Sequence, residues 1–233
     1  MPEHISKQFD SDLEAVRSRV LQMGGLVEQQ IVMAMEGLAT GDIDLLNKVI
    51  GDDHRVNALD VEIDDACQHI IARRQPAATD LRMVMTMIKT TSDLERIGDE
   101  AEKVARMSKM IYEADRVNMP RFHEVRHMAD LAIEMLRKAL DAFARLDLSA
   151  AAQVVRADLQ VDEEYRAIIR QLITFMMEDP RTISIALEIL SIAKALERIG
   201  DHAKNMSEYV VFLVKGKDVR HTSVEEVERQ ALE

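Results

Sequence analysis

The sequence LERIGD stands at residues 94–99 and again, unchanged, at residues 196–201. Six identities in a row at a spacing of 102 positions predict an internal duplication. Residues four apart share one face of a helix, so each copy places a Glu beside an Asp. The paired like charges are unfavourable, and a helix-interior glycine costs about 1 kcal/mol relative to alanine. We therefore expect a cation between the carboxylates and a close neighbour at the glycine.

Apolar residues recur every three or four positions along most of the chain, which predicts long helices. The expected helices span residues 9–38, 42–74, 77–112, 121–146, 149–177 and 180–215, with Asp42 as a cap. The breaks between them fall at residues 40–42, 75–76, 118–120, 147 and 179–180. Loops this short make successive helices antiparallel. The predicted fold is all-α: two tandem three-helix bundles from an internal duplication.

The expected boundaries follow the repeat. Residues 1–116 form the first three-helix repeat and residues 117–216 form the second. Residues 217–233 form a charged tail, either a short helix or disordered.

Composition restricts the function classes. The chain has 233 residues and a net charge of −12, which disfavours binding to nucleic acid or to anionic lipid headgroups. It has neither a basic leader followed by an apolar run nor a stretch of 18 apolar residues, so we expect no membrane insertion. The single cysteine, Cys67, fits a core position and a reducing, cytoplasmic setting.

A second repeated pattern supplies further oxygen ligands. Residues 49–57 resemble residues 154–162 at a spacing of 105, and each segment carries an acid or amide pair with four-residue spacing. Carboxylate and amide oxygens suit hard cations such as Fe, Mn or Mg. The candidate metal ligands are Asp53, Asn57, Glu95 and Asp99 in the first half and Asp158, Asp162, Glu197 and Asp201 in the second. Four acids against three acids and an amide predict tighter binding in the second half.

Simpler readings compete with a metal site. The acids could face solvent, or pair with Arg96 and Arg198. His202 could join the second cluster, although adjacent helix positions diverge by about 100°. A di-iron enzyme in a helical bundle needs two Glu-x-x-His motifs, and only residues 124–127 fit. The chain has no phosphate-binding glycine loop, nucleophile elbow or zinc-ligand spacing, so we expect no catalytic residues.

Three segments carry a resemblance to a known family. Residues 73–82 (RRQPAATDLR), 176–183 (MMEDPRTI) and 196–205 (LERIGDHAKN) resemble the PhoU phosphate-signalling proteins, and the resemblance covers nearly the whole chain. It implies two three-helix bundles. Some family members bind multinuclear iron or other metal clusters at paired Glu/Asp-x-x-x-Asp motifs, one per half. This sequence departs at Asn57 and at Lys103, which matches Asn205, and both departures disfavour the first site.

The resemblance also implies a function. It implies a cytoplasmic, homodimeric negative regulator of the phosphate-starvation regulon and of phosphate uptake. Such a protein is an adaptor between the ATPase subunit of the phosphate-specific ABC transporter and a membrane sensor histidine kinase, and is not an enzyme. Two alternatives remain open: a carboxylate metal-cluster enzyme and a metal-binding structural bundle.

Overall fold

The computed structural model describes residues 7–114 and 123–232, and helices are the only regular elements within these ranges. They are α1 (Lys7–Thr40), α2 (Ile43–Arg74), α3 (Ala78–Glu113), α4 (His123–Arg145), α5 (Leu148–Glu178), the 3₁₀ turn η1 (Pro180–Thr182), α6 (Ile183–Lys215) and α7 (Val224–Leu232). The predicted all-α fold is confirmed. The predicted break at residues 118–120 and the first six residues lie outside the described ranges.

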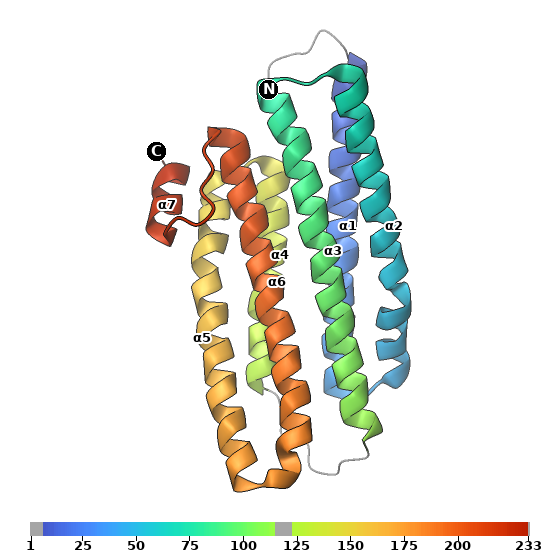
Figure 1. Ribbon diagram of the computed structural model, residues 1–233, viewed down its shortest axis with the longest axis vertical. Helices are drawn as coiled ribbons and strands as arrows, with labels where there is room; N and C mark the ends of the chain where they lie inside the picture. The colour runs from blue at the N-terminus through green and yellow to red at the C-terminus, as the bar shows by residue number, and fades with distance from the viewer. Residues whose placement is uncertain (1–6, 115–122, 233) are drawn as a thin grey trace.

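The long helices form two bundles that lie side by side. Helices α1, α2 and α3 pack on one another, as do α4, α5 and α6, and α3 contacts α6 along the middle of the molecule (Figure 1). Because the connections are short, each helix runs antiparallel to the one before it, so α1 and α3 are parallel within the first bundle. The second bundle runs the opposite way, so α3 and α6 meet antiparallel. This contact places the two LERIGD segments at the interface between the halves.

Equivalent aspartates begin the second helix of each bundle. Asp42 Oδ1 accepts a hydrogen bond from the Leu45 backbone N–H at 3.0 Å, and Asp147 Oδ1 accepts one from Ala150 at 3.0 Å. Each bond satisfies a backbone donor that the first helical turn leaves free. The predicted cap at Asp42 is confirmed. The two caps are 105 residues apart, the same spacing as Asp53 and Asp158.

Helices α1 and α4 also pack against each other, and this contact joins the two halves. An added Cβ at Gly24 of α1 would lie 2.4 Å from Leu140 Cδ2 of α4, whereas Gly25 has open space around it. Gly24 therefore permits the approach of α1 to α4. Cys67 lies in the core, as predicted, and burial raises the pKa of its thiol to about 12.

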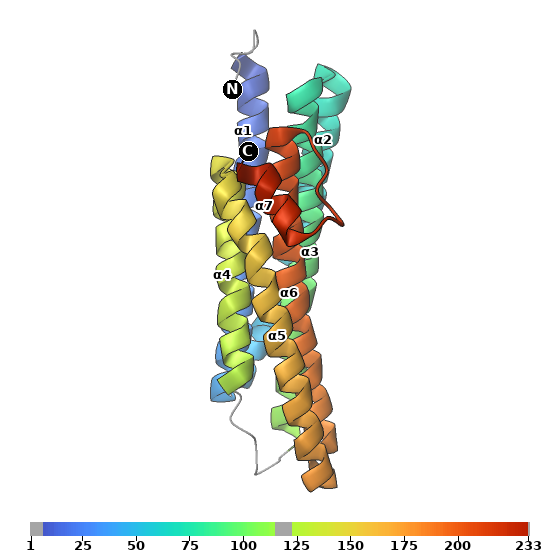
Figure 2. The same cartoon turned by 90° about the vertical axis from the view of Figure 1, so that its left-hand side faces the viewer.

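The C-terminal segment folds back as helix α7 against α5 and α6 (Figure 2). Val219, Val227 and Ala231 are buried in this contact. The Arg156 guanidinium donates hydrogen bonds from Nε and Nη2 to the two carboxylate oxygens of Glu228. Of the two possibilities for the tail, the structure shows the helix. No helix in the described part of the chain is long and apolar enough to cross a membrane.

Candidate metal-binding site

The eight candidate ligands lie on the second and third helices of each half. Helices α2 and α3 carry the first set, and α5 and α6 carry the second. Helices α2 and α3 pack against each other, as do α5 and α6, and candidate carboxylates on the paired helices lie close enough to influence one another's charge. The charge of Asp99 on α3 contributes to a raised pKa of Asp53 on α2, after burial and the charge of Glu102. In the second half the charges of Asp158 and Asp162 contribute to a raised pKa of Asp201, after burial and Glu197.

In the first half, the carboxylates have little compensation. The Asn57 amide Nδ2 donates to Asp53 Oδ2 at 2.9 Å, while Asp53 Oδ1 is buried and has no hydrogen-bond partner among the described residues. Burial, followed by the charges of Asp99 and Asp60, raises the pKa of Glu95, and Arg96 only partly offsets the rise. These carboxylates therefore lie in a field that favours either a proton or a bound cation.

Gly98 explains how polar groups gather at this point. A Cβ there would lie 3.2 Å from Val56 Cγ1, 3.6 Å from Gln30 Oε1 and 3.7 Å from Asp53 Oδ1. Gln30 of α1 is only 3% exposed, and neither of its amide atoms has a partner within residues 7–114 and 123–232. An unpaired buried amide is costly, so it marks a place where a water or an ion belongs. Gln30 is not among the ligands predicted from the sequence.

In the second half, lysines already pair with the carboxylates. Lys204 Nζ donates to Asp158 Oδ2 at 2.7 Å, and Lys194 Nζ donates to Glu197 Oε2 at 2.5 Å. Asp158 is 4% exposed, and burial raises its pKa in opposition to the bond from Lys204. Burial works against the Lys204 ammonium, but the bond to Asp158 together with the charges of Asp158, Glu208 and Asp201 raises the pKa of the lysine.

The second glycine has apolar neighbours. A Cβ at Gly200 would lie 3.4 Å from Val161 Cγ1 and 3.7 Å from the Met135 Sδ and Cε atoms. Met135 therefore lies next to Gly200 in the second half, as Gln30 lies next to Gly98 in the first. The expected close approach is therefore found at Gly98, whereas the neighbours of Gly200 lie at ordinary contact distance, and the polar atoms near Gly98 have apolar counterparts near Gly200.

Several neighbouring side chains turn away from the clusters. Arg198 Nη1 lies 2.7 Å from Glu100 Oε1, and Lys103 Nζ lies 3.5 Å from Glu100 Oε2. Arg198 therefore pairs with an acid outside both candidate sets. Lys103 does too, so the structure gives no support to the expectation that it weakens the first site. His202 Nδ1 lies 2.7 Å from Asp93 Oδ1 of α3, so it links the two halves and does not join the second cluster.

The two donor sets differ in how well they fit a metal ion. Within the described ranges, no three His, Cys, Asp or Glu side chains converge on a point that could hold a metal in the arrangement seen. The first half nevertheless offers the oxygen donors that a hard cation prefers, with a buried unpaired Asp53 Oδ1 beside the unpaired Gln30 amide. The second half fits a metal poorly, because Lys204 and Lys194 already neutralise two of its four carboxylates.

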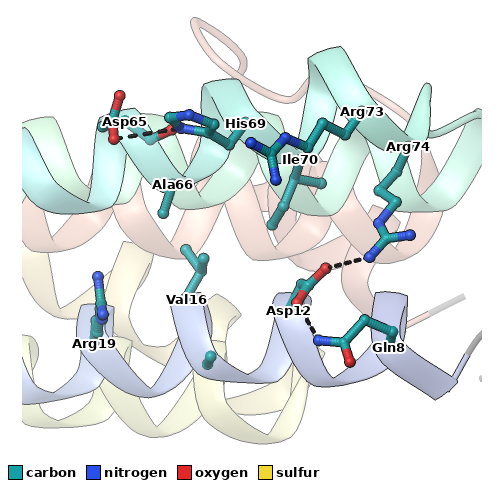
Figure 3. A pocket seen from close by; sticks show the side chains of 11 residues that line it. Gln8, Asp12, Val16, Arg19, Asp65, Ala66, His69, Ile70, Arg73 and Arg74 are labelled. Atoms are coloured by element: carbon teal, nitrogen blue, oxygen red, sulfur yellow. Dashed lines mark hydrogen bonds and ion pairs between the residues drawn. The ribbon is translucent and has the colours of Figure 1, made fainter.

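A hollow of about 570 Å³ lies apart from both clusters, between α1 and α2 (Figure 3). Its polar side chains are mostly paired across or along the helices. Arg74 Nη2 donates to Asp12 Oδ2 at 3.0 Å, and His69 Nδ1 lies 3.3 Å from Asp65 Oδ2. None of the eight predicted ligands lines it.

Comparison with known proteins places the chain in a family. Residues 20–108 and 125–210 each match the family model of the PhoU domain. The chain belongs to the PhoU family. The resemblance predicted from the sequence is confirmed, and each matched PhoU domain falls within one of the two predicted repeats.

Three PhoU relatives show how far the similarity extends. A "phosphate-specific transport system accessory protein PhoU homolog" from Pseudomonas putida is 48% identical over 222 residues, which cover 95% of this chain and 86% of the relative. The crystal structure of PhoU from Pseudomonas aeruginosa matches with a TM-score of 0.86 and 47% identity, over 90% of this chain and 100% of the other. The "phosphate transport system regulatory protein PhoU" of Streptococcus pneumoniae matches with a TM-score of 0.84 and 29% identity, over 91% and 99%.

Proposed function

We propose that this protein is a phosphate-transport accessory protein that negatively regulates the phosphate-starvation regulon and phosphate uptake. It acts in the cytoplasm as a homodimeric adaptor between the transporter ATPase subunit and a membrane sensor histidine kinase. The observation that carries the proposal is a match over nearly the whole chain to relatives named as accessory or regulatory proteins of phosphate transport. Those names favour regulation over catalysis.

The physical character of the molecule supports an adaptor. A regulator of this kind changes its partners by binding one conformation more tightly than another, and about 1.4 kcal/mol of difference shifts the equilibrium tenfold. Long helices offer extended surfaces for such binding. Exposed apolar side chains also gather in residues 173–187, around the turn between α5 and α6, where Met177 is 80% exposed. Apolar groups clustered at a surface are typical of protein contacts.

We also propose a metal-binding role for the first-half cluster. Asp53, Asn57, Glu95 and Asp99 would hold a hard cation such as Fe, Mn or Mg. When bound, the cation would supply positive charge that neutralises facing carboxylates. Because these residues come from α2 and α3, such an ion would also tie the two helices together.

Capture from membranes tests the adaptor. Tagged full-length protein is incubated with detergent-solubilised membranes of phosphate-replete cells at about 0.1 M and about 1 M salt, where the Debye length falls from about 10 Å to about 3 Å. We expect the transporter ATPase and the kinase to be retained, and less of each at high salt, because a chain of net charge −12 favours basic partner surfaces. An unrelated acidic helical protein with the same tag is the control. Failure to capture either partner at any salt would reject the adaptor.

A further inference from the structure

Two positions beside the candidate sites, matched by the repeat spacing, carry different chemistry in the two halves. Glu102 and Lys204 are 102 residues apart, the spacing of the LERIGD copies, so an acid in one half matches a lysine in the other. Gln30 and Met135 are 105 residues apart, and each lies within 4 Å of the Cβ position of its own glycine. The second half has a cation and an apolar neighbour where the first has an acid and an amide.

Lys204 lies where it can replace an ion. Its ammonium bonds Asp158 at 2.7 Å, and it also acts electrostatically on Asp201 and Glu208. The Asp158 side chain is 6% exposed and the Lys204 side chain 30% exposed, so the pair is largely withdrawn from water. A buried carboxylate is stable only with a partner charge and hydrogen bonds, and Lys204 supplies both.

Among the described residues of the first half, Arg55, Lys103 and Arg106 pair with Asp52, Glu100 and Glu102, and none of them bonds a candidate ligand. Glu102 adds a charge near Asp53, and Arg106, which lies 2.5 Å from Glu102, does no more than cancel it. Among the described residues, Asp53, Glu95 and Asp99 therefore form no ion pair, and only the charge of Arg96 partly offsets that of Glu95. In the second half, Lys204, Lys194 and Arg166 pair with Asp158, Glu197 and Asp162, so only Asp201 of the four carboxylates lacks an ion pair among the described residues. When the neighbouring cations are included, the first half has the more negative cluster. This reverses the order of metal affinity predicted from the candidate ligands alone.

We infer that only the first half has kept a metal site, and that the Lys204 ammonium takes the place of the cation in the second half. A metal entering the second half would have to displace Lys204 from Asp158 and leave the ammonium beside a like charge. The inference rests on the proposed metal-binding role of the first half, and it does not depend on the regulatory role.

Manganese binding to the full chain tests the inference. Chelator-stripped protein is dialysed against Mn²⁺, and bound Mn²⁺ per chain is counted by equilibrium dialysis and by the loss of the free-ion EPR signal. We expect one strong site. Asp99→Asn should weaken it about tenfold or more, and Asp201→Asn should leave it within about twofold. Two sites of equal affinity would overturn the inference while leaving the first-half metal site standing, and no Mn²⁺ uptake would overturn both.

A pair of reciprocal substitutions tests the role of Lys204 directly. Lys204→Met should open a second Mn²⁺ site, and Glu102→Lys should abolish the first. Because Lys204→Met leaves Asp158 unpaired, its far-UV spectrum and melting temperature are measured with and without Mn²⁺. We expect Mn²⁺ to raise its melting temperature, since an ion that binds only the folded state stabilises it. The double variant Lys204→Met/Asp158→Asn, which removes both charges, should bind no second ion. One Mn²⁺ in folded Lys204→Met, or two in the wild type, contradicts the inference.

Discussion

Glu208 is a buried acid on α6 with a mixed set of charged neighbours. It is 7% exposed, and burial, with the charges of Asp158 and Asp218, raises its pKa to about 7 although Lys204 and Arg220 oppose the rise. Between about pH 4.5 and 7 the folded protein therefore holds a proton that the unfolded chain has released. Deprotonation of Glu208 must weaken the folded state as the pH rises.

Glu208→Gln should remove this dependence. The free energy of unfolding of the wild type should fall relative to that of the variant between pH 5 and 8, by about 1–3 kcal/mol. Urea unfolding of both proteins at several pH values measures the difference. Glu163→Gln, at an exposed position on α5, is the matched control and should parallel the wild type. Parallel curves for Glu208→Gln as well would contradict the assignment.

The candidate ligands could be predicted because four-residue spacing on a helix and the sequence repeat are local patterns. Asp53 and Asp99 come from different helices, and short loops were enough to predict that these would be neighbours. Gln30 and Lys204 could not be assigned in the same way. Gln30 reaches the site from a third helix, α1. The Lys204 side chain is long enough to reach several different acids, so its partner does not follow from its position in the sequence. Comparing Glu102 with Lys204 at the repeat spacing would have supplied the missing signal.

At the scale of elements, Gly24 and Gly25 provide a test of the contact between α1 and α4. Both substitutions to alanine gain the same intrinsic helix propensity, about 1 kcal/mol. Only Gly24→Ala places a methyl group against Leu140, at 2.4 Å. We expect Gly24→Ala to be less stable than Gly25→Ala by about 1–3 kcal/mol, the usual range for overpacking. Thermal unfolding of the two variants measures this difference, and equal stability would show that the contact is loose.

Helix α7 should depend on packing for its order. A helix of nine residues is too short to be stable alone, so burial of Val227 and Ala231 must hold it. Val227→Asp should raise amide exchange of residues 224–232 without raising it in α1–α3. Glu228→Gln, which removes an exposed ion pair with Arg156, should have a much smaller effect on the protection of α7, because solvent screens exposed ion pairs. Unchanged protection of α7 in Val227→Asp would contradict a packing-dependent helix.

The long helices and the tail differ in how well sequence predicts them. Helices of about 30 residues have repeated apolar stripes and end at Gly, Pro or capping Asp, so their ends were predicted to within a few residues. The tail has only a short apolar pattern among charges. Helix α7 is ordered by its contacts with α5 and α6, which are distant from it in sequence. The sequence of the tail alone could therefore not distinguish a short helix from a disordered segment.

At the scale of the molecule, duplication has produced two bundles with one shared interface. The contact of α3 with α6 places both LERIGD segments near the centre, where buried pairs such as His202 with Asp93 join the halves. If an ion binds in one half only, the two bundles are free to serve different roles. One bundle would respond to a metal, while the other keeps a fixed internal ion pair.

The proposed role of this protein is to keep the phosphate-starvation response off when phosphate is plentiful. The most direct measurement is a starvation-gene reporter in a strain lacking this protein, grown in phosphate-rich medium. We predict that the reporter is on without the protein, as in starved cells, and off again when the full-length chain is restored. A reporter that stays off in the deletion strain would contradict the account.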